Sequence, residues 1–150
     1  MARTTFDKLD VWNHAVNLTV QIHSAAETCT HDTLSDRVLQ AAVSVAALIA
    51  AGAERASLKD FLDCVRHARG AAAELRTHLH VMERIGALEQ SVAAELHREV
   101  MALNDKLHQL ARSLGHTAPD DYILPPAPYK DTQAAPRRGR PRRGKLAADD

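Results

Sequence analysis

Apolar residues recur at helical spacing in four long stretches of the chain, and no stretch alternates between apolar and polar residues as a half-buried strand would. The clearest stretch is the last, in which apolar side chains step by three or four residues: Val92, Leu96, Val100, Leu103, Leu107, Leu110 and Leu114. This spacing places them on one face of a helix. Three similar stretches precede it, so the sequence predicts an all-α protein, an antiparallel up-down four-helix bundle.

The helices are expected at about residues 6–27, 34–53, 57–85 and 88–114, within a bundle domain at 1–116. Thr5 and Ser57 are candidate N-caps, because a hydroxyl oxygen can accept a hydrogen bond from a first-turn N–H group. Gly86 and Gly115 follow the third and fourth helices, where glycine commonly ends a helix. Gly70 lies inside the third helix, and we expect it to permit a close approach of another helix.

The second predicted helix is apolar on nearly all sides. Between residues 41 and 53, Ser44 is the only polar side chain. A helix at the surface of a monomeric bundle normally keeps one polar face toward water. A helix without such a face is expected to make a further contact outside its own bundle. We therefore predict self-association. Four apolar residues are predicted to lie at the subunit interface: Trp12, Val45, Leu48 and Ile49.

Residues 117–150 differ in composition from the rest of the chain. All six prolines lie there, and we predict a mostly disordered C-terminal tail. The segment PRRGRPRRG, at 136–144, is similar at its centre to an AT-hook, in which an extended Arg-Gly-Arg enters the minor groove of A·T-rich DNA. The alternative is a disordered tail that does not bind nucleic acid. The residues predicted to contact nucleic acid are Arg137, Arg138, Gly139, Arg140, Arg142, Arg143 and Lys145.

Charge, cysteine usage and hydropathy indicate a cytoplasmic protein. The formal net charge is zero, so bulk charge does not make the chain a nucleic-acid binder. Cys29 and Cys64 form no CxxC pair, which favours a reducing compartment. The N-terminal MARTTFDKLD lacks the apolar core of a signal peptide. No uninterrupted apolar run reaches the ~18 residues of a membrane span, so we expect no membrane partner.

Candidate catalytic chemistry is sparse. Asp105 and His108 approximate one half of the paired Glu-x-x-His motifs of di-iron bundles, but no second half exists. No phosphate-binding loop, nucleophile elbow or HExxH motif is present. We therefore expect no catalytic residue, no metal and no cofactor. A metal- or thiol-dependent enzyme, with Cys64 close to Asp63 and His67 in sequence, is the remote alternative.

Three motifs carry a resemblance to a known family: FDKLDVWNHAVNL at 6–18, AAVSVAALIAAG at 41–52 and ARGAAAEL at 68–75. In this order and spacing they resemble the four-helix-bundle proteins first met as products of 23S rRNA intervening sequences. Related members are the accessory proteins of diversity-generating retroelements. The resemblance implies a closed homopentamer with no established enzymatic activity. It also implies nucleic acid and a reverse transcriptase as partners of the accessory proteins.

The chain departs from that family where members often carry polar groups. Leu39 and Gln40 stand in place of an Arg pair, and Leu48 and Ala51 stand in place of Asn and Glu. We expect a non-enzymatic, homo-oligomeric (pentameric) helical scaffold that binds DNA or RNA through its tail, with a protein such as a reverse transcriptase as a further partner. The alternative is a protein–protein interaction module with no role in nucleic-acid binding.

Overall fold

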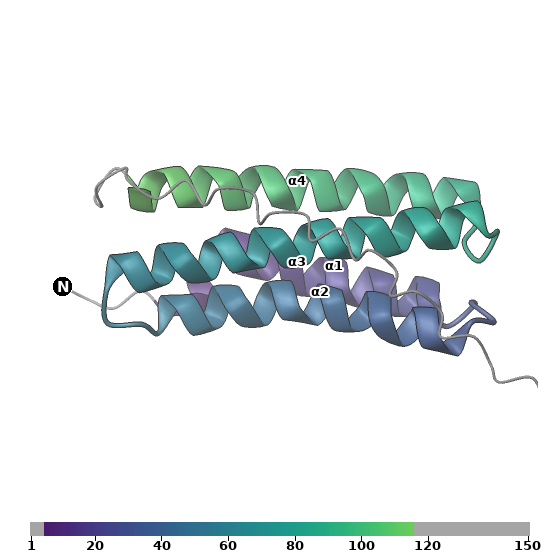
Figure 1. Cartoon of the computed structure of the whole chain (residues 1–150), viewed down its shortest axis with the longest axis horizontal. Coiled ribbons are helices and arrows are strands. Elements are labelled where there is room, and N and C mark those ends of the chain that lie inside the picture. The colour runs from purple at the N-terminus through teal and green to yellow at the C-terminus, as the bar shows by residue number, and fades with distance from the viewer. Residues whose placement is uncertain (1–4, 116–150) are drawn as a thin grey trace, which may run out of the picture. The chain divides into compact units, whose positions relative to one another are not determined.

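The structure, a computed structural model, describes residues 5–115, which form an all-α four-helix bundle (Figure 1). A short 3-10 turn, Phe6–Lys8, precedes the helices α1 (Asp10–Ala26), α2 (Asp32–Ala53), α3 (Leu58–Arg84) and α4 (Gln90–Gly115). No strand occurs between residues 5 and 115. The predicted fold class is therefore confirmed. The predicted tail and its Arg-rich segment lie outside the described residues.

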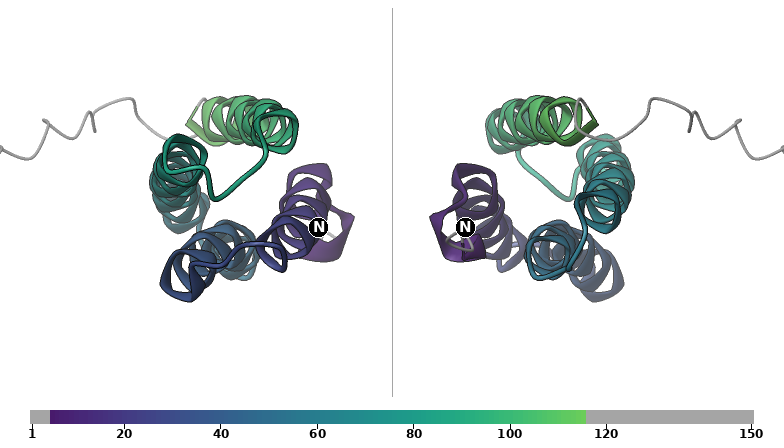
Figure 2. Two further views of the ribbon diagram at one scale, coloured as in Figure 1. Left: turned by 90° about the vertical axis from the view of Figure 1, so that its right-hand side faces the viewer. Right: turned by 90° about the vertical axis from the view of Figure 1, so that its left-hand side faces the viewer.

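The four helices follow one another around the bundle in chain order, as the end-on views show (Figure 2). Consecutive helices run antiparallel, so α1 and α4, the first and the last, complete the circuit. The contacts are most extensive between α2 and α3 and between α3 and α4, and they are fewest between α1 and α4. The seam between α1 and α4 is therefore the least tightly packed of the four.

The core of the bundle is aliphatic. Its largest fully buried side chains come from all four helices: Leu18, Ile22, Ile49, Leu75, Leu79, Met82, Leu103 and Leu107. No aromatic side chain of the described part is fully buried. The predicted seam of α4 is confirmed at five positions, and Val92 and Leu110 are half-buried at its edges. An aliphatic, alanine-containing core brings helices close together, and its stability depends on close packing.

The helix ends confirm one predicted cap and correct another. The Ser57 hydroxyl accepts a hydrogen bond from the Asp60 N–H group at 3.1 Å, as expected of an N-cap. Thr5 precedes the 3-10 turn and makes no such bond, and extended backbone at Leu9 separates this turn from α1. The prediction of one continuous first helix is wrong at this point. Gly86 has a left-handed φ of +73° and ends α3 as predicted.

Two glycines differ in what surrounds them. A Cβ atom at Gly52 of α2 would lie 2.7 Å from Cys64 Cβ and equally close to the ring of Phe61, both on α3. A Cβ atom at Gly70 would have no neighbour within 4 Å. The prediction that Gly70 permits a close helix approach is therefore wrong within one chain. The close approach is between α2 and α3, at Gly52.

Candidate subunit interface

The side of α2 that faces away from the core is uncharged over most of its length. Between Val38 and Ala53 the chain has no charged residue, and charged residues flank this stretch on both sides. Val43, near its centre, is 49% exposed. Helical geometry places five exposed or half-buried apolar residues together on this side. We call them the α2 outer face: Leu39, Val43, Ala47, Ala50 and Ala51.

The polar groups beside the α2 outer face are partly satisfied inside the helix. The Ser44 hydroxyl donates to the backbone carbonyl oxygen of Gln40 at 2.8 Å, so this hydroxyl needs no bond to water. Most side chains of the face are small, and small side chains allow two helix axes to approach closely. The α2 outer face is therefore suited to pack against another helix.

The interface residues predicted from the sequence lie in two different environments. Val45 and Ile49 are both 0% exposed, because their side chains belong to the core of their own chain. Neither side chain can contact a second copy, so the prediction is corrected at these positions. Leu48 and Trp12 are half-buried at the edge of the core. Trp12 also makes an edge-to-face contact with Phe6, with ring centroids 5.1 Å apart.

By length and composition alone, α2 is also apolar enough to cross a membrane, with a mean hydropathy of 1.5 over an 18-residue window. The apolar residues of α2 are interrupted by Gln40 and Ser44, so they form no uninterrupted run of that length. About a third of that window, 33%, is buried inside the bundle. Those inner residues pack against α1 and α3, so the outer face is the part of α2 left for a further contact.

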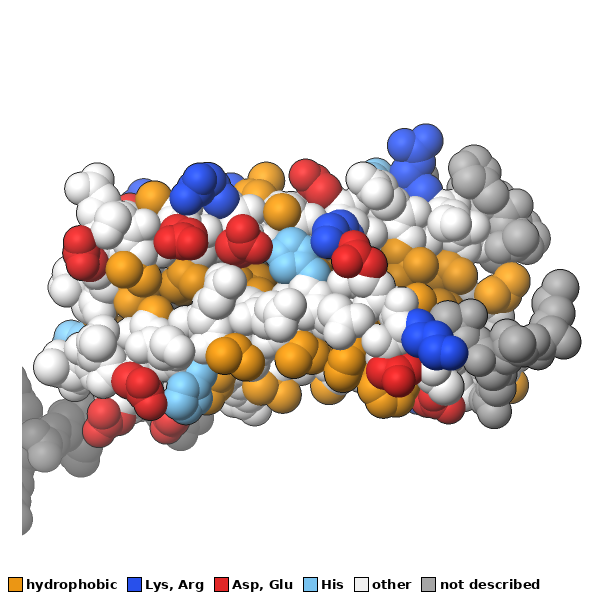
Figure 3. All heavy atoms as spheres, turned by 180° about the vertical axis from the view of Figure 1, so that it is seen from behind, with side chains coloured by type: hydrophobic (Ala, Val, Ile, Leu, Met, Phe, Trp, Pro, Cys, Tyr) orange, Lys and Arg blue, Asp and Glu red, His pale blue; other side chains and the backbone are white. Residues whose placement is uncertain are grey.

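A second apolar surface lies in the seam between α1 and α4. A groove of about 550 Å³ is bordered by the acidic residues Glu89 and Glu95. In the view from behind, apolar side chains are visible in a hollow beside acidic ones (Figure 3). Val20, on the α1 side of the groove, is 61% exposed. The apolar residues that line the groove are Val20, Ala25, Leu88, Val92 and Leu96. We call this surface the α1–α4 groove.

A hydrogen bond and an ion pair connect α1 to α4 along the same seam. His14 Nε2 lies 2.9 Å from Glu99 Oε2, and Lys106 Nζ lies 2.7 Å from Asp10 Oδ2. The hydrogen bond and the charge of Lys106 lower the pKa of Asp10 below its usual value. Polar contacts thus contribute to the attachment of α1 where it has the fewest contacts with its neighbour.

Among the residues considered for catalysis, Asp63 pairs with an arginine. The Asp63 carboxylate accepts a hydrogen bond from Arg66 at 3.1 Å. Cys29 and Cys64 form no disulfide. A cluster that the sequence did not reveal joins α3 and α4: His80, Glu83 and His97. No sequence spacing signals it, because His97 reaches the other two only across the α3–α4 hairpin.

Comparison with known proteins gives a family match and a structural match. Residues 7–109 match the family described as 23S rRNA-intervening sequence protein. A crystal structure of a protein with unknown function from the S23 ribosomal protein family, from Bacteroides thetaiotaomicron, is similar with a TM-score of 0.64. The two are 17% identical, over 68% of this chain and 95% of that chain, so the likeness shows the fold alone. Comparison with curated proteins gives no match.

Proposed function

Because the chain belongs to the family of 23S rRNA-intervening sequence proteins, we propose that it is a non-enzymatic, cytoplasmic scaffold that assembles into a closed homopentamer through the α2 outer face. The observation that supports this proposal is the uncharged stretch from Val38 to Ala53, whose outer side stays exposed in a single chain. The pentameric state is the one that the family resemblance implies.

A closed ring of five copies needs two different surfaces on each copy, because its contacts are heterologous. The α2 outer face is one surface, and the α1–α4 groove is the other. The two lie in different parts of the bundle, so one copy can offer α2 while it receives α2 from another. Burial of apolar area stabilises such a contact by about 25 cal/mol per Å².

Three exposed valines provide a matched test. Val43 lies on the α2 outer face, Val20 lines the α1–α4 groove, and Val81 lies on α3 outside both surfaces. We expect native mass spectrometry of the full chain to give five times the chain mass of 16.4 kDa. Val43→Glu and Val20→Glu each place a charge in the contact and should yield monomers. Val81→Glu should leave the assembly intact.

A monomeric wild-type chain would contradict this proposal. The α2 outer face would then be a binding site for a different protein, which is the protein–protein interaction alternative. If Val43→Glu prevents assembly and Val20→Glu does not, the α2 outer face is part of the interface and the α1–α4 groove is not.

We extend the proposal to nucleic acid through the tail. The segment from Arg137 to Lys145 contains six positive charges and no negative charge. A ring of copies would present several such segments together, and multivalency raises avidity without any new contact. Fluorescence anisotropy should compare the full chain with a chain that ends at Ala134, using A·T-rich duplex, G·C-rich duplex and structured RNA.

The full chain should bind with a steep dependence on salt, because each neutralised phosphate releases counterions. The shortened chain should bind at least about tenfold more weakly at low salt, where most of the electrostatic affinity resides. Equal binding by both chains would exclude the tail as the binding segment. Preference for the A·T-rich duplex would support insertion of Arg-Gly-Arg into the minor groove.

A further inference from the structure

Three side chains of metal-binding type meet across the α3–α4 hairpin. His80 and Glu83 lie one turn apart on α3, and His97 reaches them from α4. His97 Nε2 lies 3.2 Å from Glu83 Oε2, and His80 Nδ1 lies 3.8 Å from the same oxygen. One potential ligand atom from each residue lies within 4.8 Å of the others.

Hydrogen bonding accounts for only part of this arrangement. The contact of His97 with Glu83 is within hydrogen-bond distance, whereas His80 at 3.8 Å is beyond it. The two imidazole rings lie with centroids 4.0 Å apart and planes inclined by 30°, so the two rings lie against each other. A cation bound by all three residues would give His80 a direct role in the cluster, which hydrogen bonding does not.

The separations suit a small divalent ion. Zinc binds imidazole nitrogen at about 2.0 Å, which places neighbouring ligand atoms of a tetrahedral site ~3.4 Å apart. Two of the observed separations, 3.2 and 3.8 Å, lie on either side of this value. Small rotations of exposed side chains would complete the geometry, and His80 is the most exposed of the three, at 50%.

We propose that His80, Glu83 and His97 form a binding site for a divalent transition metal, and that this metal is Zn²⁺. This departs from our expectation of a chain without metal ligands. Two imidazole nitrogens and one carboxylate oxygen suit Zn²⁺, Co²⁺ or Ni²⁺, whereas Ca²⁺ and Mg²⁺ require a shell of oxygen ligands. Three protein ligands leave at least one coordination position open.

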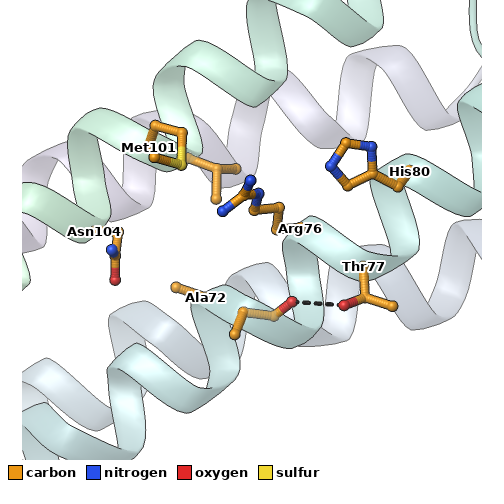
Figure 4. A pocket seen from close by; sticks show the side chains of 8 residues that line it. Ala72, Arg76, Thr77, His80, Met101 and Asn104 are labelled. Carbon is orange, nitrogen blue, oxygen red and sulfur yellow. Dashed lines mark hydrogen bonds between the residues drawn. The ribbon is translucent and has the colours of Figure 1, made fainter.

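A cavity of about 330 Å³ borders His80, and its lining includes neither Glu83 nor His97. Arg76 and His80 project from α3 into this cavity, with Met101 and Asn104 opposite them on α4 (Figure 4). Solvent reaches the half-exposed His80 side chain, so water can supply the remaining ligand.

The second shell limits the affinity of the site. When Nε2 of a histidine binds a metal, Nδ1 carries the proton and usually donates it to a partner. His97 Nδ1 is buried and has no hydrogen-bond partner among the described residues. Because such partners commonly change affinity by about 10- to 100-fold, we expect a site weaker than one with a complete second shell.

The test uses the full chain without a polyhistidine tag, treated with chelator and then titrated with ZnCl₂ by isothermal calorimetry. One ion per chain should bind saturably. His80→Gln, Glu83→Gln and His97→Gln should each weaken binding by at least about tenfold, since each removes a ligand. His78→Gln is the matched control, because His78 lies on α3 but pairs with Glu74 at 3.4 Å, outside the cluster.

A second readout separates metal binding from folding. Zn²⁺ bound only to the folded chain raises the Tm of the wild type and of His78→Gln, whereas the three ligand variants should show no rise. Co²⁺ should give visible absorption bands with the wild type that the ligand variants lose. Equal Zn²⁺ affinity of the wild type and His80→Gln, or no Tm rise in the wild type, would overturn the proposal and leave a hydrogen-bonded cluster.

Discussion

At the scale of single residues, two glycines on neighbouring helices show how local space decides the effect of one methyl group. Gly52 has α3 atoms 2.7 Å from the position of a Cβ, whereas Gly70 has none within 4 Å. Both lie in helices, where glycine lowers stability by roughly 1 kcal/mol relative to alanine. Only at Gly52 does the folded structure need a glycine, because a Cβ atom there would clash with α3.

Gly52→Ala and Gly70→Ala should therefore change stability in opposite directions. Gly52→Ala forces α2 and α3 apart and should destabilise the fold by about 1–3 kcal/mol. Gly70→Ala gains helix propensity and should stabilise it by up to about 1 kcal/mol. Urea unfolding followed by circular dichroism measures both. Stabilisation by Gly52→Ala would show that α3 yields at this contact.

The ion pair between Asp10 and Lys106 has a predictable response to pH. Lys106 lowers the pKa of Asp10, so the pair stabilises the fold above the ordinary pKa of 3.8. This contribution is lost as the pH falls through the lowered pKa of the folded state, and it is small because Asp10 is exposed. Lys106→Met should return the pKa of Asp10 toward 3.8, as measured by NMR titration of the carboxyl carbon. An unchanged pKa would exclude Lys106 as its cause.

The residues of the candidate interface could be predicted only in part. Helical periodicity identified α2 as apolar on both sides, but it could not show which side its own chain covers. Val45 and Ile49 were predicted to lie at the subunit interface and are 0% exposed, whereas Val43 is 49% exposed. The difference depends on the rotation of α2 about its axis, which α1 and α3 determine and no single-helix pattern contains.

At the scale of helices, the N-cap predicted from the sequence is correct where the capping side chain forms a hydrogen bond to the backbone. Ser57 has that bond to Asp60 and begins α3 as predicted. Thr5 has the same type of side chain, but its helix begins later, after extended backbone at Leu9. Hydroxyl groups favour caps without requiring them, so residue type alone could not distinguish the two positions.

Substitution of these two residues compares a formed cap with an unformed one. Ser57→Ala removes the hydrogen bond to Asp60 and should destabilise the fold by about 1 kcal/mol. Thr5→Ala removes no such bond and should change stability by less than about 0.5 kcal/mol, as is usual for surface substitutions. Thermal unfolding of both variants provides the measurement. Equal losses would mean that Thr5 forms its cap in solution.

At the scale of the whole molecule, the four helices differ in how extensively they contact their neighbours. α3 contacts both α2 and α4 extensively, whereas α1 meets α4 through the fewest contacts. The number and order of the helices followed from sequence periodicity. This uneven packing did not, because it depends on how far each pair of helices approaches.

Hydrogen exchange should show α1 opening before α3. Its backbone amides are expected to exchange faster than those of α3, since local opening costs least where few apolar contacts break. Glu99→Gln weakens the hydrogen bond with His14 and should speed exchange in α1 a few-fold, in keeping with about 0.5–1.5 kcal/mol per hydrogen bond. Glu74→Gln is the control, because Glu74 pairs with His78 inside α3. Equal exchange throughout the bundle would contradict uneven attachment.

The position of Trp12 determines what intrinsic fluorescence can report. It is the only tryptophan of the chain, and it lies half-buried near the start of α1 against Phe6. Its emission therefore reports on the edge of the bundle and is insensitive to the centre formed by α2 and α3. A red shift that precedes the loss of helical circular dichroism would record the detachment of α1 alone. An experimenter who followed fluorescence only would take that detachment for the melting of the whole protein.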